Sequence, residues 1–294
     1  MIVRKTENLI YKGISRLNLI QNQNAAFLII GAQKAGTSTL FDSLCCHPQL
    51  TRSFEKEIGF FHRDKMYAKG RNWYNKQFIP SFSKQSLSYE ATPEYLFFPN
   101  VAKRIYEYSP SIKLIIVLRD PVSRAYSAWN MFKQKVENDA SRKRLLEVNA
   151  VFANDKQREM ILNIVEHHPF PSFEYFVETE LNYSKFDDFS EGHNFLRRGL
   201  YAKQIREYLK FFHSSQLLII EMNELKNNMV EVFKKIEVFL DVKGFRGWDT
   251  KILKPSHQRS YGEKISETTK KQLKTFYAPY NEDLYELIQT RFDW

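Results

Sequence analysis

A glycine-rich stretch near the start of the chain, FLIIGAQKAGTSTL at 27–40, has the composition of a phosphate-binding loop. Gly31 and Gly36 permit a tight turn between an apolar strand and a helix, whose first backbone amides attract oxyanions. The Walker pattern GxxxxGK[ST] requires a lysine after its second glycine, where this chain has Thr37. The lysine stands at position 34 instead, inside the loop. The stretch therefore predicts an anion site with the added charge of Lys34, and a plain glycine turn is the alternative.

A second stretch, LRDPVSRAYSAW at 118–129, combines a strand end with the start of a helix. Arg119 follows the apolar run and Ser127 lies two turns into the helix, so the pair can bind a phosphate from two sides. The alternative is a salt bridge between Arg119 and Asp120 beside a solvated helix. Asp120 is a poor match to the metal-binding aspartate of Mg-nucleotide hydrolases, which, with the displaced lysine, disfavours that class.

A third stretch, FEKEIGFF at 54–61, places two acidic residues around Lys56, followed by an apolar tail. Carboxylates beside aromatic side chains can have raised pKa values and serve as general bases. An exposed charged loop is the alternative interpretation.

Metal and serine-hydrolase chemistry are disfavoured. The 7 histidines show no metal-ligand spacing, and the chain has no CxxC, HExxH or GxSxG pattern. We therefore predict no structural or catalytic metal.

The cysteines and the hydropathy pattern bear on location. Cys45 and Cys46 are adjacent in a predicted helix, where an ordinary disulfide is hard to form, so nothing indicates an oxidising compartment. No segment approaches the roughly 20 apolar residues of a membrane span, and no leader peptide is evident. We predict a cytoplasmic protein without a transmembrane segment.

Composition favours one large α/β domain with anionic partners. The chain has 294 residues, 43% of them hydrophobic and 27% charged, which is ordinary for a globular protein. Its net charge of +10 favours nucleotides, acidic polysaccharides or other anions. The basic residues are spread along the chain, so we predict no nucleic-acid partner, and the sequence does not indicate an oligomeric state.

Short apolar runs alternate with helical patterns along most of the chain, which predicts a doubly wound and mainly parallel sheet. The predicted strands are AAFLII, QLTRS, SLSYEAT, IKLIIVLRD and QLLIIEMNEL. Helical spacing is present in STLFDSLCCH, PNVAKRIYEYSP, PVSRAYSAWNMFKQ, GLYAKQIREYLKFF and NMVEVFKKIEVFL. We predict an N-terminal arm over 1–24 and a single domain over 25–294, with a helical insertion at about 132–180.

An ordered set of segments resembles the sulfotransferases that use 3′-phosphoadenosine 5′-phosphosulfate (PAPS), and is most similar to the branch with heparan sulfate sulfotransferase domains and their bacterial relatives. The resemblance covers about residues 25–292, in the segments GAQKAGTSTL, HPQL, EKEIGFF, YEATPEYLF, LRDPVSRAYSAW, RGLYAKQIREYLKFF and FYAPYNEDLYELI. It implies a P-loop-like three-layer fold with a mainly parallel central sheet flanked by helices.

The resemblance also implies roles for individual residues. Lys34 would stabilise the charge that develops as the phosphate leaves, and Glu57, rather than Glu55, would be the general base. Arg119 and Ser127 would bind the 3′-phosphate. The implied PAPS-binding residues are Lys34, Ala35, Gly36, Thr37, Ser38, Thr39, Arg119, Ser127 and Arg259.

The implied reaction moves a sulfuryl group from PAPS to a hydroxyl of a carbohydrate or glycolipid, without a metal, and leaves 3′-phosphoadenosine 5′-phosphate. The chain has Ser38, Gly59 and Ala91 where heparan sulfate members often carry other residues, which weakens the case for a heparan-like acceptor and leaves the PAPS assignment intact. A hydroxylated acyl chain or small metabolite is the first alternative acceptor, and it predicts an apolar tunnel in the insertion. A nucleotide kinase or a non-catalytic nucleotide-binding protein is the second alternative.

Overall fold

The chain divides into two compact units, which are described separately below. The computed structural model describes residues 24–80, 85–152, 165, 170–182, 194–248 and 264–294. The first unit comprises Met1–Arg119 and Gln204–Gln258, and the second comprises Asp120–Lys203 and Arg259–Trp294. The predicted single domain stays a prediction, and the predicted arm over 1–24 lies outside the described residues except for Asn24.

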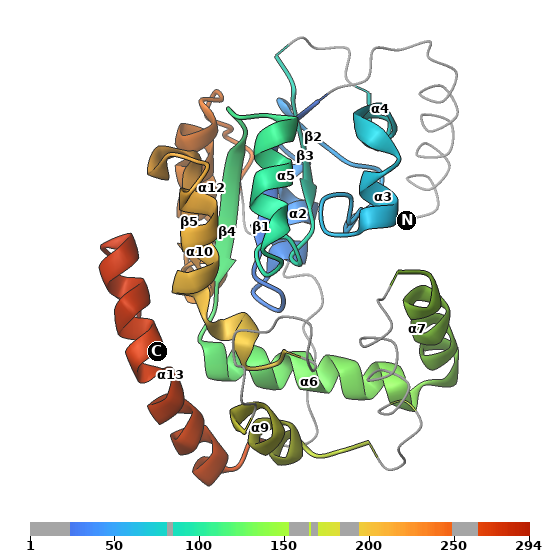
Figure 1. Cartoon of the computed structure of the whole chain (residues 1–294). Coiled ribbons are helices and arrows are strands. Elements are labelled where there is room, and N and C mark those ends of the chain that lie inside the picture. The colour runs from blue at the N-terminus through green and yellow to red at the C-terminus, as the bar shows by residue number, and fades with distance from the viewer. Residues whose placement is uncertain (1–23, 81–84, 153–164, 166–169, 183–193, 249–263) are drawn as a thin grey trace. The chain divides into compact units, whose positions relative to one another are not determined.

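The first unit is built on a five-stranded sheet of order β2-β3-β1-β4-β5 (Figure 1). Its strands are β1 (Ala25–Gly31), β2 (Leu50–Arg52), β3 (Leu87–Ala91), β4 (Lys113–Leu118) and β5 (Leu217–Glu221). Every neighbouring pair is parallel. The sheet confirms all five predicted strands and their parallel arrangement.

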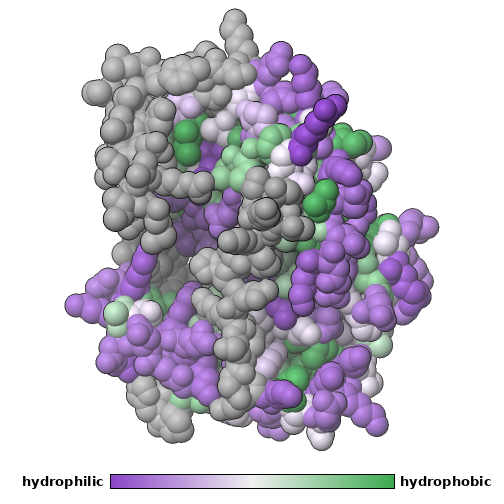
Figure 2. Space-filling model, turned by 180° about the vertical axis from the view of Figure 1, so that it is seen from behind, coloured by the Kyte–Doolittle hydropathy of each residue, from purple (hydrophilic) through white to green (hydrophobic). Residues whose placement is uncertain are grey.

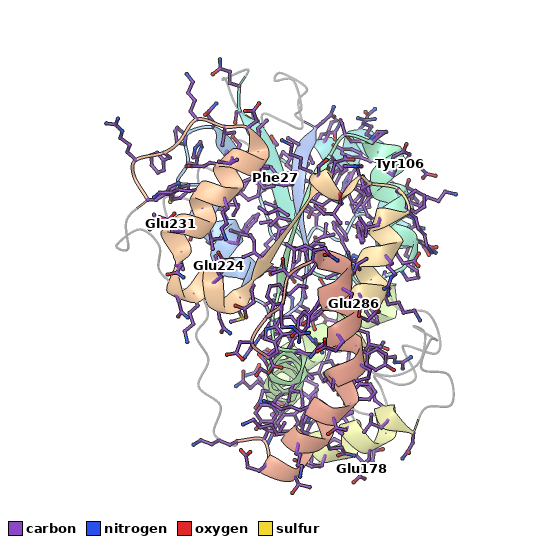
Figure 3. The ribbon with its side chains drawn as sticks, turned by 90° about the vertical axis from the view of Figure 1, so that its left-hand side faces the viewer. Phe27, Tyr106, Glu178, Glu224, Glu231 and Glu286 are labelled. Atoms are coloured by element: carbon purple, nitrogen blue, oxygen red, sulfur yellow. The ribbon has the colours of Figure 1, made fainter. Side chains whose placement is uncertain are left out.

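The central strands are the most apolar because both of their faces are covered. In β4, the five residues from Leu114 to Leu118 are fully buried, as expected for a parallel strand between two helical layers. Phe27 of β1 stacks on Tyr89 of β3 with ring centroids 4.8 Å apart, and Figure 3 shows Phe27 among the packed side chains of the sheet.

Helices cover both faces of this sheet, which gives the three layers that the sequence predicts. Figures 1 and 3 show α2 (Thr37–Leu44) and α12 (Met229–Leu240) on one face, and α5 (Asn100–Tyr108) and α10 (Tyr201–Leu209) on the other. Tyr208 of α10 fixes this second layer, because its buried hydroxyl donates to the carbonyl of Tyr95 at 2.8 Å.

Several short helices of the first unit have no counterpart among the predicted elements. They are α3 (Asp64–Tyr67), α4 (Gly70–Asn75), α11 (Met222–Asn227) and the 3-10 turn Ser214–Gln216. The expectation that both cysteines lie within a helix is wrong: α2 ends at Leu44, Cys45 is its C-cap, and Cys46 follows in a turn. Both thiols are free.

The regular structure of the second unit is helical, with no strand among its described residues. It contains α6 (Pro121–Glu137), α7 (Asp139–Phe152), α9 (Phe173–Leu181), the 3-10 turn Arg197–Gly199 and α13 (Glu267–Ile288). Its core joins Trp129 of α6 with Phe173 of α9 and Leu273 of α13. Because α6 runs unbroken to Glu137, the predicted insertion at 132–180 begins inside this helix, and the rest of that range is described only in part.

A buried charged cluster lies within this second unit. The Glu180 side chain is 1% exposed, and its two carboxylate oxygens accept the backbone N–H groups of Phe195 and Leu196. Arg124 and Arg197, which are 0% and 2% exposed, act on the same carboxylate with their positive charges. Arg124 also donates to the carbonyl of Phe195. The cluster therefore ties α6, α9 and the turn at Arg197–Gly199 together.

The aromatic residues are used mainly as core. The large apolar side chains that stand out as exposed among the described residues are Tyr106, Tyr175, Val238 and Tyr280. The face shown in Figure 2 is correspondingly hydrophilic over most of its described part, with hydrophobic side chains in small separate patches.

Candidate active site

The loop between β1 and α2 forms an open helix N-terminus. Gly36 is the N-cap of α2 at φ 90, a left-handed conformation that favours glycine, and it offers no side chain to cap the first turn. The amides at the start of α2 are therefore suited to an oxyanion. Thr37 and Thr39 are buried in this first turn, whereas Ser38 is partly exposed. This geometry supports the predicted anion site.

Lys34 and Arg119 meet at this loop. Lys34 has a left-handed backbone with φ 69, which is unfavourable for a residue with a side chain. Arg119, directly after β4, donates from Nη1 to the carbonyl oxygen of Lys34 at 3.0 Å. Ala35 is fully buried, and its amide donates to the carbonyl of Ala32. The arginine therefore fixes the loop backbone where the lysine departs from the Walker pattern.

The remaining predicted phosphate ligands have different outcomes. Ser127 is buried in α6 at 2% exposure and belongs to the second unit, so its pairing with Arg119 stays a prediction. Arg259 lies outside the described residues. Asp120 caps α6: its carboxylate accepts the amides of Val122 and Ser123 at 3.3 and 3.0 Å. Capping accounts for the aspartate at the strand end without a metal ion.

Glu57 lies on a strained turn beside β3. It has φ 64, and Gly59 two residues later has φ 71, so the chain reverses through two left-handed positions. The Glu57 side chain is 53% exposed, and Lys56 donates to its Oε1 at 2.6 Å. The Glu57 amide donates to the carbonyl of Ala91, the last residue of β3, at 2.9 Å. Strained non-glycine residues of this kind gather at functional sites.

One buried carboxylate beside the Glu57 turn was missed by the sequence analysis. Glu90 of β3 is completely buried, and its carboxylate accepts hydrogen bonds from the hydroxyls of Tyr74, Tyr95 and Thr92. Burial raises the pKa of Glu90, while these hydroxyls and the Ile58 amide act in the opposite direction. The available signal was a charged residue within an otherwise apolar strand, because a buried glutamate requires partners.

Three strand ends bring these groups to one edge of the sheet. Because β3, β1 and β4 are adjacent and parallel, their carboxyl ends lie on the same side. The β1 end carries Lys34, the β4 end carries Arg119, and the β3 end holds the turn with Glu57. This edge of the sheet therefore carries the anion-binding start of α2, the cations Lys34 and Arg119, and the exposed carboxylate of Glu57. Such a set of groups suits the transfer of an anionic group to a deprotonated acceptor.

Comparison with known proteins gives one consistent family. The family described as sulfotransferase domain matches residues 24–278. Among similar proteins, the membrane-associated sulfotransferase kil1 of Dictyostelium discoideum is 27% identical, over 91% of this chain and 66% of its own length. The heparan sulfate glucosamine 3-O-sulfotransferase 5 of Mus musculus is 25% identical, over 91% of this chain and 73% of its own length.

The fold is shared with a solved bacterial structure. The sulfotransferase from Alicyclobacillus acidocaldarius matches with a TM-score of 0.63 and 24% identity, covering 92% of this chain and 98% of that chain.

Among the described helices, none has the length and apolar character of a membrane span.

Proposed function

This chain belongs to the sulfotransferase domain family, and on that premise we propose that it transfers a sulfuryl group from PAPS to a hydroxyl of an acceptor. The observation that carries the proposal is the edge of the sheet where Lys34, Arg119 and the Glu57 turn follow adjacent parallel strands. The family match supports sulfotransfer over the kinase alternative.

PAPS would bind at the loop between β1 and α2. The uncapped start of α2 suits its 5′-phosphate, and Lys34 would stabilise the charge that develops on the departing phosphate. Arg119, with Ser127, would receive the 3′-phosphate. Ala35, Ser38 and Thr39 complete the loop around the nucleotide, and Arg259 is a further candidate for the 3′-phosphate.

Glu57 would act as the general base. The acceptor hydroxyl gives its proton to the Glu57 carboxylate while its oxygen attacks sulfur. The new bond joins that oxygen to sulfur, and the bond that breaks joins sulfur to the bridging oxygen of the phosphosulfate. 3′-Phosphoadenosine 5′-phosphate leaves with the bonding electrons. Such in-line displacement depends chiefly on positioning and requires no metal from the protein.

We propose a carbohydrate or glycolipid hydroxyl as the acceptor and the cytoplasm as the location. The support for a carbohydrate is the similarity to a heparan sulfate glucosamine 3-O-sulfotransferase and the net charge of +10, which favours anionic chains. A hydroxylated acyl chain or small metabolite stays the alternative, because the segment predicted to form its tunnel is described only in part.

Calorimetric binding of two nucleotides tests the donor. We expect the purified protein to bind 3′-phosphoadenosine 5′-phosphate tightly without added metal and to bind ATP with magnesium weakly. Preference for ATP with magnesium would contradict the proposal. Labelled PAPS, offered with a panel of oligosaccharides, glycolipids and hydroxylated acyl chains, then identifies the acceptor class.

A matched pair of variants tests the base. Glu57→Gln is expected to lower the transfer rate by about 10²- to 10⁴-fold while nucleotide binding stays within about twofold. Glu55→Gln, which changes the exposed glutamate on the other side of Lys56, is the control and is expected to retain the wild-type rate. Lys34→Ala is expected to lower the rate by about 10²- to 10³-fold and also to weaken nucleotide binding. Full turnover in Glu57→Gln would remove Glu57 from the mechanism.

A further inference from the structure

The backbone amides of the turn that carries Glu57 donate mainly to one neighbouring segment. The amide of Glu57 donates to the Ala91 carbonyl at 2.9 Å. The next amide, that of Ile58, donates to the Glu90 carboxylate. The amide of Gly59 reaches Thr92 Oγ1 at 3.4 Å.

The same pattern continues beyond the turn. The amide of Phe61 reaches Tyr95 Oη at 3.4 Å. Four amides between 57 and 61 thus end on acceptors between 90 and 95. The segment at 90–95 therefore serves as the template for the turn.

Glu90 decides whether the two hydroxyls of this template can accept. A hydroxyl has one hydrogen, and those of Thr92 and Tyr95 point to the Glu90 carboxylate at 2.8 and 2.7 Å. With their hydrogens committed in this way, both oxygens present only lone pairs to the Gly59 and Phe61 amides. A hydrogen-bond donor at position 90 would force the Thr92 or Tyr95 hydroxyl to rotate. The hydrogen of that hydroxyl would then point at the Gly59 or Phe61 N–H, so that two donors would face each other.

We propose that Glu90 is a positioning residue, which orders the turn that presents Glu57 by fixing the direction of the Thr92 and Tyr95 hydroxyls. The inference rests on the proposed role of Glu57 as general base. Glu90 is 0% exposed and therefore does not itself meet the acceptor. Its effect is exerted through the backbone of 57–61.

The structure supplies a matched control within the same network. Tyr74 donates to the same Glu90 oxygen as Tyr95, at 2.8 Å, and is equally buried. No hydrogen bond described for its hydroxyl leads to the turn at 57–61. Tyr74→Phe therefore removes a buried hydrogen bond to Glu90 and leaves the template intact, whereas Thr92→Val removes a template acceptor with little change in shape.

Hydrogen exchange at the 57–61 amides tests the proposal in the full-length protein. We expect Glu90→Gln and Thr92→Val to accelerate this exchange by about tenfold, and Tyr74→Phe to leave it within about twofold of wild type. All three variants are expected to lower the midpoint of urea unfolding, so a purely structural role would not separate them. If Glu90→Gln fails to fold, the comparison of Thr92→Val with Tyr74→Phe decides.

Transfer from labelled PAPS provides the second readout. Glu90→Gln and Thr92→Val are expected to lower kcat by about 10- to 100-fold, because a small misplacement of a reacting group has effects of that size. The KM for PAPS and the calorimetric affinity for 3′-phosphoadenosine 5′-phosphate are expected to stay within about twofold, since the hydrogen bonds described for the 57–61 amides lead to residues 90–95 and not to the nucleotide loop. Tyr74→Phe keeps the wild-type kcat.

The two proposals fail in different ways. Wild-type exchange at 57–61 in both Glu90→Gln and Thr92→Val, or equal acceleration in Tyr74→Phe, would overturn the positioning role. A wild-type protein that neither binds 3′-phosphoadenosine 5′-phosphate nor transfers sulfate would overturn the proposed function, and the exchange experiment would still decide whether Glu90 orders the turn.

Discussion

Glu90 in the first unit and Glu180 in the second are both buried carboxylates, but they are stabilised by different partners. Glu90 is surrounded by three hydroxyls and one amide, all of them neutral donors. Glu180 accepts two amides and faces the buried charges of Arg197 and Arg124. A carboxylate held by hydroxyls sets the direction of their hydrogens, whereas one held by cations balances charge. The arrangement around Glu90 suits a candidate active site, and the arrangement around Glu180 suits the linking of helices.

The largest effect is expected where removal of the charge leaves cations buried. Glu180→Gln should destabilise the protein by about 3–5 kcal/mol, because Arg124 and Arg197 lose their counter-charge. Two Arg124 nitrogens, Nε and Nη1, already lack a hydrogen-bond partner among the described residues. Urea unfolding measures the loss. Glu178→Gln, two residues away on the exposed side of α9 (Figure 3), is the control and should change little. Equal stability of Glu180→Gln and Glu178→Gln would contradict the view that Glu180 balances buried positive charge.

A smaller loss is expected for Glu90→Gln. The glutamine keeps the shape of the side chain and one acceptor oxygen, and its introduction leaves no buried cation without a partner. The free energy of unfolding should fall by about 1–3 kcal/mol, the range for a buried polar group that loses its match. The same urea experiment measures it. A loss larger than that of Glu180→Gln would mean that the neutral network holds more of the fold than the charged cluster does.

The pH dependence of stability sharpens the same contrast. Burial raises the pKa of Glu90 above its ordinary value of 4.5, so the folded state retains a proton that the unfolded chain has released. The stability contributed by this carboxyl is present below pH 4.5 and is lost as the pH rises toward the raised pKa. The advantage of the wild type over Glu90→Gln should therefore shrink from pH 4.5 upward, by at most about 1.4 kcal/mol per pH unit. Urea midpoints of both proteins across this range measure it, and an advantage that grows with pH would contradict the sign.

The smallest effect is expected at an exposed ion pair. Arg291 binds both carboxylate oxygens of Glu282, which lowers the pKa of that glutamate. Both side chains are more than half exposed, so water and salt screen the pair. Glu282→Gln should leave the urea midpoint within experimental error at 0.15 M salt. A clear shift of the urea midpoint would show that the two hydrogen bonds of this ion pair outweigh its exposure. The ranking of the three glutamates by burial would then be wrong.

Much of the first unit was predictable because its strands are short, apolar and closed by glycine, proline or a charge. The second unit was harder to predict. The 22-residue α13 contains Pro279 and a mixed polar surface, so neither its length nor its period stood out. The helices α3 and α4 have four and six residues, too few for a periodic pattern. The packing of α6 through Trp129 and Phe173 depends on contacts far apart in the chain, which local spacing does not reveal.

The residues of the candidate site could be proposed from the sequence, whereas their geometry could not. Lys34, Gly36 and Arg119 were found from their places at strand ends, and the structure brings them together at one loop. Glu57 was chosen over Glu55 by resemblance, because both glutamates occupy the same charged stretch. Nothing local in the sequence announces the left-handed backbone at Glu57 or the template at 90–95. These arise when β3 lies beside the turn, which is a property of the folded sheet.

The left-handed backbones of Lys34 and Glu57 have an evolutionary consequence. Glycine at either position would remove a conformational penalty of about 1–2 kcal/mol, partly offset by its greater freedom in the unfolded chain. A library screened only for thermal survival should therefore accept glycine at 34 and 57. A library screened for turnover should keep lysine and glutamate there. At these two positions, selection for activity and selection for stability therefore favour different residues.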